Sequence, residues 1–150
     1  MITQEEFEII LGYKKKFKTD DLIDLYGASQ WERGIVSIES NDIFILSYHH
    51  GTINFEKYTF NNRHPAIVLL RFDSMGTHTN PDEEGKTFRG PHVHIYREGF
   101  GDKIAFPVSE IGLDKNNLKR EAVLPVFLRY CNVQNYPRMQ SSYQPTLFSK

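Results

Sequence analysis

Residues 31–72 carry the pattern that most restricts the fold, because β-branched and aromatic residues recur there between polar, turn-forming residues. Residues 67–70 are apolar on both faces, which in a strand indicates cover from two sides and a central place in a sheet. His50 and Gly51 are typical of a tight turn between two strands. The region is therefore predicted to form four strands, at residues 34–39, 43–48, 52–60 and 65–73.

A helix is predicted before this region. Thr3 and Glu6 have the spacing of a capping box, and apolar residues then recur at helical spacing. The basic run at residues 14–18 suits the negative end of a helix dipole. These features together predict one helix over residues 3–17.

The second half of the chain is expected to complete an α+β fold. Residues 74–91 are rich in Gly, Pro and polar side chains, which predicts a connection of unusual length. Residues 92–97 and 103–108 are expected to pair as a hairpin, which brings the mostly antiparallel sheet to about six strands. Asp114 is expected to cap a C-terminal helical segment that Pro125 kinks or restarts.

Length and composition predict one domain over residues 1–150, with residues 133–150 as an extended tail. The longest apolar runs are far shorter than the ~20 residues of a membrane span, and the acidic N-terminus does not resemble a signal peptide. With a single cysteine, the protein is expected to be cytoplasmic. The net charge of −1 gives no general attraction to phosphate, so any nucleic-acid contact needs a local patch.

The polar residues with the clearest chemistry lie on two of the predicted strands. A period of two places His92, His94 and Tyr96 on one face of their strand. Arg71 and Asp73 likewise share one face of the preceding strand. If the two strands are neighbours, these polar faces meet.

Such a set is suited to binding and cleaving a phosphodiester. A histidine with a pKa near neutrality can move a proton, and a guanidinium can hold a phosphate as negative charge develops. An exposed, hydrogen-bonded face without chemistry is the alternative for each histidine taken alone. We predict His92, His94, Arg71 and Asp73 as catalytic residues, and His78, Tyr96, Arg97 and Lys103 as substrate-binding residues.

A metal site is a further alternative. His92 and His94, followed by Glu98, match the first half of a metal motif that resembles the cupin family. A cupin takes another histidine ligand from a later strand, and no histidine follows His94 in this chain. Neither a metal nor another cofactor is therefore predicted.

Three motifs between residues 67 and 108 resemble an uncharacterised family of small bacterial and phage proteins. They are Leu-Leu-Arg-Phe-Asp at 69–73, His-Thr-Asn-Pro-Asp at 78–82 and Pro-His-Val-His-Ile-Tyr-Arg-Glu-Gly-Phe-Gly-Asp-Lys at 91–103. The arginine strand, the histidine loop and the Pro-His-x-His strand are also similar to TumE-type toxins of toxin–antitoxin modules. That resemblance implies an endoribonuclease-like toxin or a non-toxic relative, with matching positions at Arg71, Asp73, His78, His92 and His94.

Three functions follow as hypotheses. The first is a toxin-like endoribonuclease of a mobile element, whose partners are RNA and a cognate antitoxin. The second is a phage- or plasmid-encoded inhibitor that binds a host defence protein, for example a CRISPR complex, through a patch such as Asp82, Glu83 and Glu84. The third is a metal-dependent small-molecule enzyme. Both enzymes need convergent polar side chains, whereas an inhibitor needs only a surface.

Overall fold

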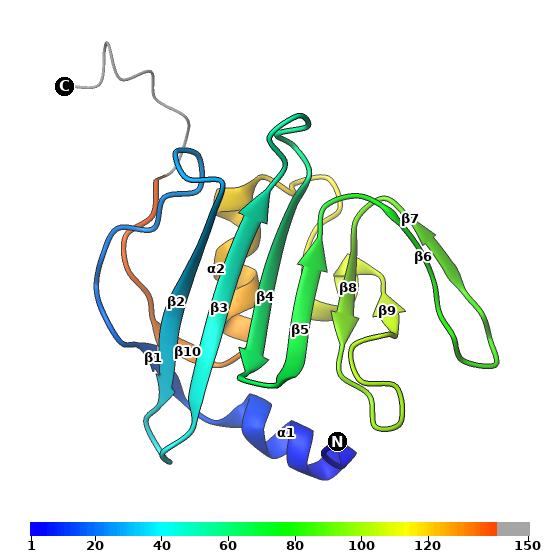
Figure 1. Cartoon of the computed structure of the whole chain (residues 1–150), viewed down its shortest axis with the longest axis horizontal. Helices are drawn as coiled ribbons and strands as arrows, with labels where there is room; N and C mark the ends of the chain where they lie inside the picture. Colours follow the sequence, from blue (N-terminus) through cyan, green and yellow to red (C-terminus); the bar gives the residue numbers. More distant parts are fainter. Residues whose placement is uncertain (141–150) are drawn as a thin grey trace.

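An eight-stranded sheet organises the chain in the computed structural model, which describes residues 1–140 (Figure 1). Its strands are β1 (Lys15–Phe17), β2 (Gln30–Ser37), β3 (Ile43–His50), β4 (Tyr58–His64), β5 (Ile67–Asp73), β8 (His92–Ile95), β9 (Ala105–Phe106) and β10 (Val133–Asn135). They lie in the order β10-β1-β2-β3-β4-β5-β8-β9, and all neighbours are antiparallel except β1 and β10. The predicted mixture of helices and sheet is confirmed, and β5 is an interior strand.

One face of the sheet is the core face. Phe60, Phe72 and Val93 lie opposite one another on β4, β5 and β8, and their side chains are fully buried. The helix α2 (Arg120–Tyr130) covers this face, and its Phe127 ring lies 5.9 Å from the ring of Phe60. Because α2 lies behind the sheet in Figure 1, the opposite face points toward the viewer.

The predicted N-terminal helix is too long. The helix α1 spans Gln4–Gly12, and the predicted capping box of Thr3 and Glu6 is present. The basic run then enters the sheet as β1 instead of continuing the helix. Lys15 is fully buried, and its Nζ donates to the carbonyl oxygens of Leu11, Tyr13 and Cys131 at 2.7, 2.9 and 2.8 Å. These acceptors satisfy a buried ammonium group that a helix end would expose to water.

Two predicted connections also differ. His50 and Gly51 do not form a tight turn, because β3 ends at His50 and β4 begins only at Tyr58. The predicted long loop at residues 74–91 contains a separate hairpin of β6 (Thr77–Thr79) and β7 (Thr87–Arg89). The predicted sheet of about six strands is wrong in number, because the short strands β1 and β10, which carry no strand-like period, bring the observed sheet to eight.

The C-terminal third contains further corrections. The predicted strand at 103–108 is shortened to β9 and followed by the 3-10 helix η1 (Val108–Ile111). Asp114 does not cap a helix, since α2 begins after Lys119 and contains Pro125 within it. The predicted tail contributes β10, and residues 141–150 lie outside the described residues.

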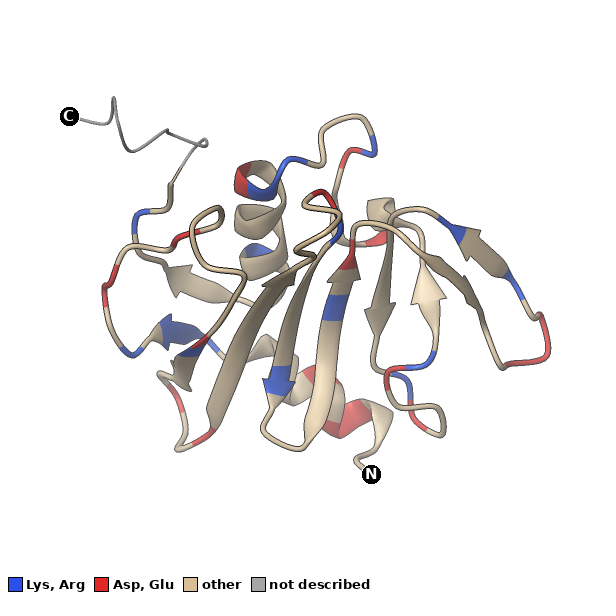
Figure 2. Cartoon of the chain, turned by 45° about the horizontal axis from the view of Figure 1, so that its top comes forward, with Lys and Arg blue, Asp and Glu red and all other residues tan. Residues whose placement is uncertain are grey.

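Charged residues of both signs are interspersed over the ribbon (Figure 2). The acidic residues 82–84 lie in the connection between β6 and β7. Among residues 1–140, no helix is long and apolar enough to cross a bilayer.

Candidate active site on the sheet face opposite α2

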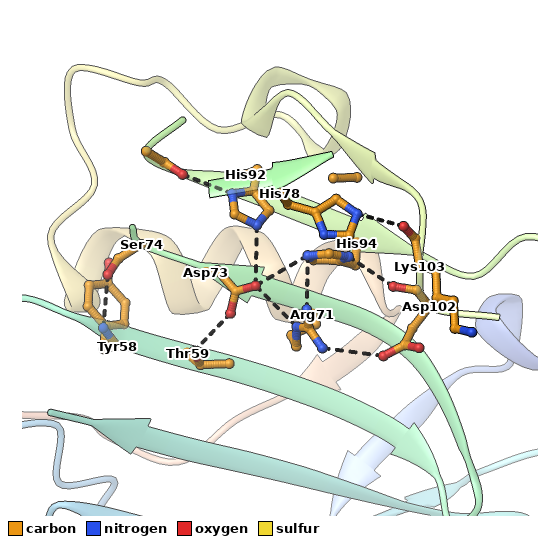
Figure 3. A network of polar contacts seen from close by, with 12 residues as sticks. Tyr58, Thr59, Arg71, Asp73, Ser74, His78, His92, His94, Asp102 and Lys103 are labelled. Carbon is orange, nitrogen blue, oxygen red and sulfur yellow. Dashed lines mark hydrogen bonds and ion pairs between the residues drawn. The ribbon is translucent and has the colours of Figure 1, made fainter. Parts of the chain in front are cut away.

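The register of three neighbouring strands places a polar cluster on the face opposite α2 (Figure 3). Arg71 of β5 pairs with His94 of β8, and Asp73 pairs with His92. On the other side, Thr59 of β4 pairs with Asp73. Residues directly opposite each other on adjacent strands share a face. The two predicted strands are therefore neighbours, and their polar faces meet.

The carboxylate of Asp73 is the centre of this cluster. Its Oδ2 lies 3.4 Å from His92 Nε2 and 3.3 Å from His94 Nε2. Arg71 Nε donates to the same oxygen at 3.1 Å, and Thr59 donates to Oδ1 at 2.9 Å. Arg71 Nη1 also lies 3.3 Å from the Asp102 carboxylate. Two carboxylates thus hold the guanidinium beside both imidazoles.

Backbone carbonyls determine which ring nitrogens carry hydrogen. His92 Nδ1 lies 2.8 Å from the carbonyl oxygen of Gly90, and His94 Nδ1 lies 2.9 Å from that of Asp102. A carbonyl only accepts, so each Nδ1 donates and each Nε2 points toward Asp73. Arg71 Nη2 lies 2.9 Å from His94 Nε2. Because a guanidinium only donates, this contact requires a neutral His94.

The two histidines therefore have different proton affinities. Burial alone would lower the pKa of His92, but its hydrogen bonds to the Asp73 carboxylate and the Gly90 carbonyl outweigh burial and raise it. For His94, burial lowers the pKa, and the Arg71 guanidinium adds to this effect against the attraction of Asp73. Asp73 has a pKa well below its ordinary value, because its partners outweigh its burial. The two imidazoles therefore differ in proton affinity, with His92 holding a proton more firmly than His94.

The hairpin of β6 and β7 covers the two imidazoles. The ring of His78 on β6 lies 4.6 Å from that of His94 and 6.0 Å from that of His92. His78 Nε2 donates to the carbonyl oxygen of Lys103 at 2.7 Å. The side chains of His92 and His94 are only 4% and 1% exposed, whereas Arg71 is 30% exposed. Solvent reaches the cluster mainly from the Arg71 side.

The structure brings together five of the eight predicted site residues, namely Arg71, Asp73, His78, His92 and His94. The other three lie differently. Tyr96 packs against Phe7 and donates its hydroxyl to the backbone of Ile2. Arg97 pairs with Asp82 at 3.2 Å, and Lys103 is exposed and contributes only its carbonyl oxygen. Tyr96 and Arg97 are therefore held by other partners, and the predicted role of these three residues in substrate binding stays a prediction.

Three further side chains belong to the site. Asp102 and Thr59 bind Arg71 and Asp73 as described. Asn61 pairs with Arg71 in the β4–β5 register, and its amide oxygen is buried without a hydrogen-bond partner among the described residues. Asp102 is not predicted as a site residue because it lies in a turn, where no strand period places its side chain. Thr59 and Asn61 of β4 can be assigned to the site only when the register of β4 with β5 is known.

The cluster also contains the donor set of a metal site. Ligand atoms of Asp73, His92 and His94 lie within 4.8 Å of one another, and two histidines with one carboxylate can hold a divalent transition metal. The backbone contacts of both Nδ1 atoms would orient Nε2 toward such an ion. However, Arg71 already donates to both His94 Nε2 and Asp73 Oδ2, and its positive charge opposes a cation there. The geometry therefore fits proton transfer better than metal binding.

Fold and site together define an α+β protein with a histidine–arginine–aspartate cluster on one face of an antiparallel sheet. A family model matches residues 2–133, and the chain belongs to this family, which is described as a family of unknown function (DUF6978). No curated protein and no solved structure was found to match the chain.

Proposed function

We propose that this protein cleaves RNA at the Arg71–Asp73–His92–His94 cluster, as a toxin-like endoribonuclease. The observation that carries the proposal is that two imidazoles, whose pKa values are shifted in opposite directions, lie on the same carboxylate beside a guanidinium. Cleavage within an RNA strand needs one base, one acid and a cation for the phosphorane. The sequence resemblance to TumE-type toxins supports the same function.

The chemistry assigns one step to each group. Neutral His94 takes the proton of the 2′-hydroxyl, whose oxygen attacks the adjacent phosphorus. Arg71 stabilises the negative charge of the phosphorane, because its guanidinium can bind two phosphate oxygens. Protonated His92 gives its proton to the leaving 5′-oxygen. The products are a 2′,3′-cyclic phosphate and a 5′-hydroxyl, while Asp73 orients both imidazoles.

Access to the imidazoles requires movement of the hairpin. Both rings are almost fully covered, with His78 above them, whereas Arg71 and Asp102 are about one-third exposed. In this proposal a phosphate first contacts Arg71, and the hairpin then moves outward to admit the ribose. A net charge of −1 gives no long-range attraction to RNA, so the Arg71 guanidinium makes the first contact.

A double substitution tests the proposal. Replacing both His92 and His94 with alanine removes the acid and the base, so RNA cleavage should fall by at least about 10²–10⁴-fold. Expression of the wild-type chain should arrest growth, and the double variant should relieve the arrest. His49→Ala is the matched control, since His49 is exposed and lies on β3 outside the cluster.

Loss of activity counts only if the variant is folded, which a thermal melt establishes. If the double variant unfolds, the paired variant His92→Gln and His94→Gln keeps polar side chains in place and should show the same loss. A folded double variant with wild-type cleavage would overturn the proposal. Absence of cleavage by the wild-type protein, together with a stoichiometric complex sensitive to changes at residues 82–84, would favour the inhibitor hypothesis instead.

A further inference from the structure

A cavity of about 810 Å³ lies at the end of β5, beside the start of α2. Its walls include Tyr26, the loop between β3 and β4, and the first residues of α2. Ser74 and Pro91 also line it. Ser74 directly follows Asp73 and Pro91 directly precedes His92 in the chain. Because consecutive Cα atoms are about 3.8 Å apart, the cavity wall adjoins two residues of the catalytic cluster.

Arg120 supplies a buried positive charge to this cavity. The residue is only 7% exposed, and its Nε donates to the Tyr48 hydroxyl at 2.8 Å while Nη2 donates to the Phe55 carbonyl. Its guanidinium carbon lies 4.2 Å from the centre of the Phe55 ring and 4.6 Å from that of Tyr58. Within residues 1–140, no carboxylate forms an ion pair with Arg120.

A buried guanidinium without an anionic partner is costly, and aromatic faces offset only part of that cost. The start of α2 adds to the positive potential, because the N-terminus of a helix carries a partial positive charge. The N-cap residue Lys119 makes no side-chain capping bond that would offset this charge. Two carboxylates also line the cavity, but neither forms an ion pair with Arg120. Glu121 accepts from the Tyr26 hydroxyl at 2.8 and 2.9 Å, and Glu56 is exposed. An anion in this cavity would therefore give the Arg120 guanidinium the ionic partner that it lacks among the described residues.

The rim of the cavity is apolar. Phe55 is 38% exposed and Met75 is 37% exposed, although both are large hydrophobic side chains. The Tyr26 ring lies 5.9 Å from the Phe55 ring. An exposed aromatic ring beside a cation favours a ligand that joins a flat apolar group to an anion.

We propose that this cavity binds one nucleotide of the RNA strand, with its base against Phe55 and its phosphate toward Arg120 and Lys119. The assignment of the ligand to RNA rests on the proposed function. Ser74 and Pro91 connect the cavity along the chain with Asp73 and His92, so the RNA strand would pass around the end of β5 to reach the scissile phosphate held by Arg71. The cavity thus positions the strand, while the cluster performs the proton transfers.

Binding of a non-cleavable probe tests this site separately from catalysis. The probe is a 2′-O-methyl tetranucleotide, which lacks the attacking hydroxyl, and its dissociation constant is measured by titration calorimetry with the full chain. Phe55→Ala removes the stacking ring and should weaken binding by about tenfold or more. Lys119→Gln should also weaken binding. Ile53→Ala is the matched control, because Ile53 lies in the same loop and is fully exposed.

The outcomes separate the two proposals. Weaker binding by Phe55→Ala and Lys119→Gln, with Ile53→Ala unchanged, supports the nucleotide site even if the wild-type chain cleaves no RNA. Wild-type affinity in both cavity variants overturns the site, even if RNA cleavage is observed. Failure of the wild-type chain to bind both the probe and free adenosine monophosphate also overturns it. If free adenosine monophosphate binds with the same dependence on Phe55 and the tetranucleotide does not bind, the ligand is a free nucleotide and the RNA assignment is wrong.

Discussion

At the level of single residues, the Asp73 carboxylate influences the pKa of both neighbouring histidines. Its Oδ2 is shared by Arg71, His92 and His94, yet the three contacts have different consequences. His92 keeps Asp73 as an anionic partner, whereas His94 faces both Asp73 and the guanidinium. The same carboxylate therefore favours a proton on one imidazole and tolerates its absence on the other.

The pH dependence of cleavage follows from these directions. His94 must be neutral, so the rate should fall as pH decreases through a pKa below the ordinary value of 6.5. His92 must be protonated, so the rate should fall as pH increases through a pKa above 6.5. The rate profile of the wild-type chain should be bell-shaped with a plateau around pH 6.5. His92→Gln should lose the alkaline limb and about 10²-fold in rate, and a retained alkaline limb would contradict the role of His92.

The residues of the site differ in how far sequence could predict them. A period of two in each strand is enough to place His92 with His94 and Arg71 with Asp73. Tyr96 follows the same period, but its ring packs against Phe7 of α1, which strand periodicity alone does not reveal. Thr59 requires the register of β4 with β5, which depends on a bulge at residues 62 and 63. The roles of all these residues in catalysis stay predictions.

The hairpin of β6 and β7 is the element on which access to the site depends. Asn80, just after β6, is 7% exposed, and its amide pairs with both backbone groups of Ala105, at 3.0 and 2.7 Å. His78 makes a second attachment, to the carbonyl oxygen of Lys103. These contacts hold the hairpin over the imidazoles and connect it to β9.

Loosening this attachment should expose the histidines. Asn80→Ala leaves the amide and carbonyl of Ala105 unpaired, which should cost about 1–3 kcal/mol locally. Amide hydrogen exchange in residues 77–89 and at Ala105 should accelerate, while exchange in β3 and β4 stays unchanged. Thr79→Ala is the control, since the Thr79 hydroxyl contacts only the exposed Thr87 hydroxyl. Equal exchange rates in Asn80→Ala and the wild-type chain would show that the hairpin is held by other contacts.

Sequence patterns located the long elements and failed on the short ones for a physical reason. Strands β3 and β4 alternate buried and partly exposed residues, and this period can be read directly. Strand β5 is recognised instead by its apolar run at residues 67–70. Strand β1 is a basic run whose Lys15 becomes buried only because Cys131 and the end of α1 supply carbonyl acceptors. No local pattern reports such partners, which lie far apart in the chain.

In the molecule as a whole, the two faces of the sheet have different roles, since one forms the core and the other carries the candidate site. One face buries Phe60, Phe72 and Val93 beneath α2, while alternate residues of the same strands carry the polar cluster on the other face. Changes to the cluster therefore need not disrupt the core. The cavity beside Arg120 lies where β5 ends and α2 begins.

We propose that the cluster cleaves RNA by proton transfer, without a metal. It is tested most directly by incubating the purified chain with RNA in excess EDTA and identifying the ends of the products. We predict cleavage that persists in EDTA, gives 2′,3′-cyclic phosphate and 5′-hydroxyl ends, and is lost when His92 and His94 are both replaced. Cleavage that requires added Mn²⁺ or Zn²⁺ and gives 5′-phosphate ends would contradict the account and assign Asp73, His92 and His94 to a metal ion instead.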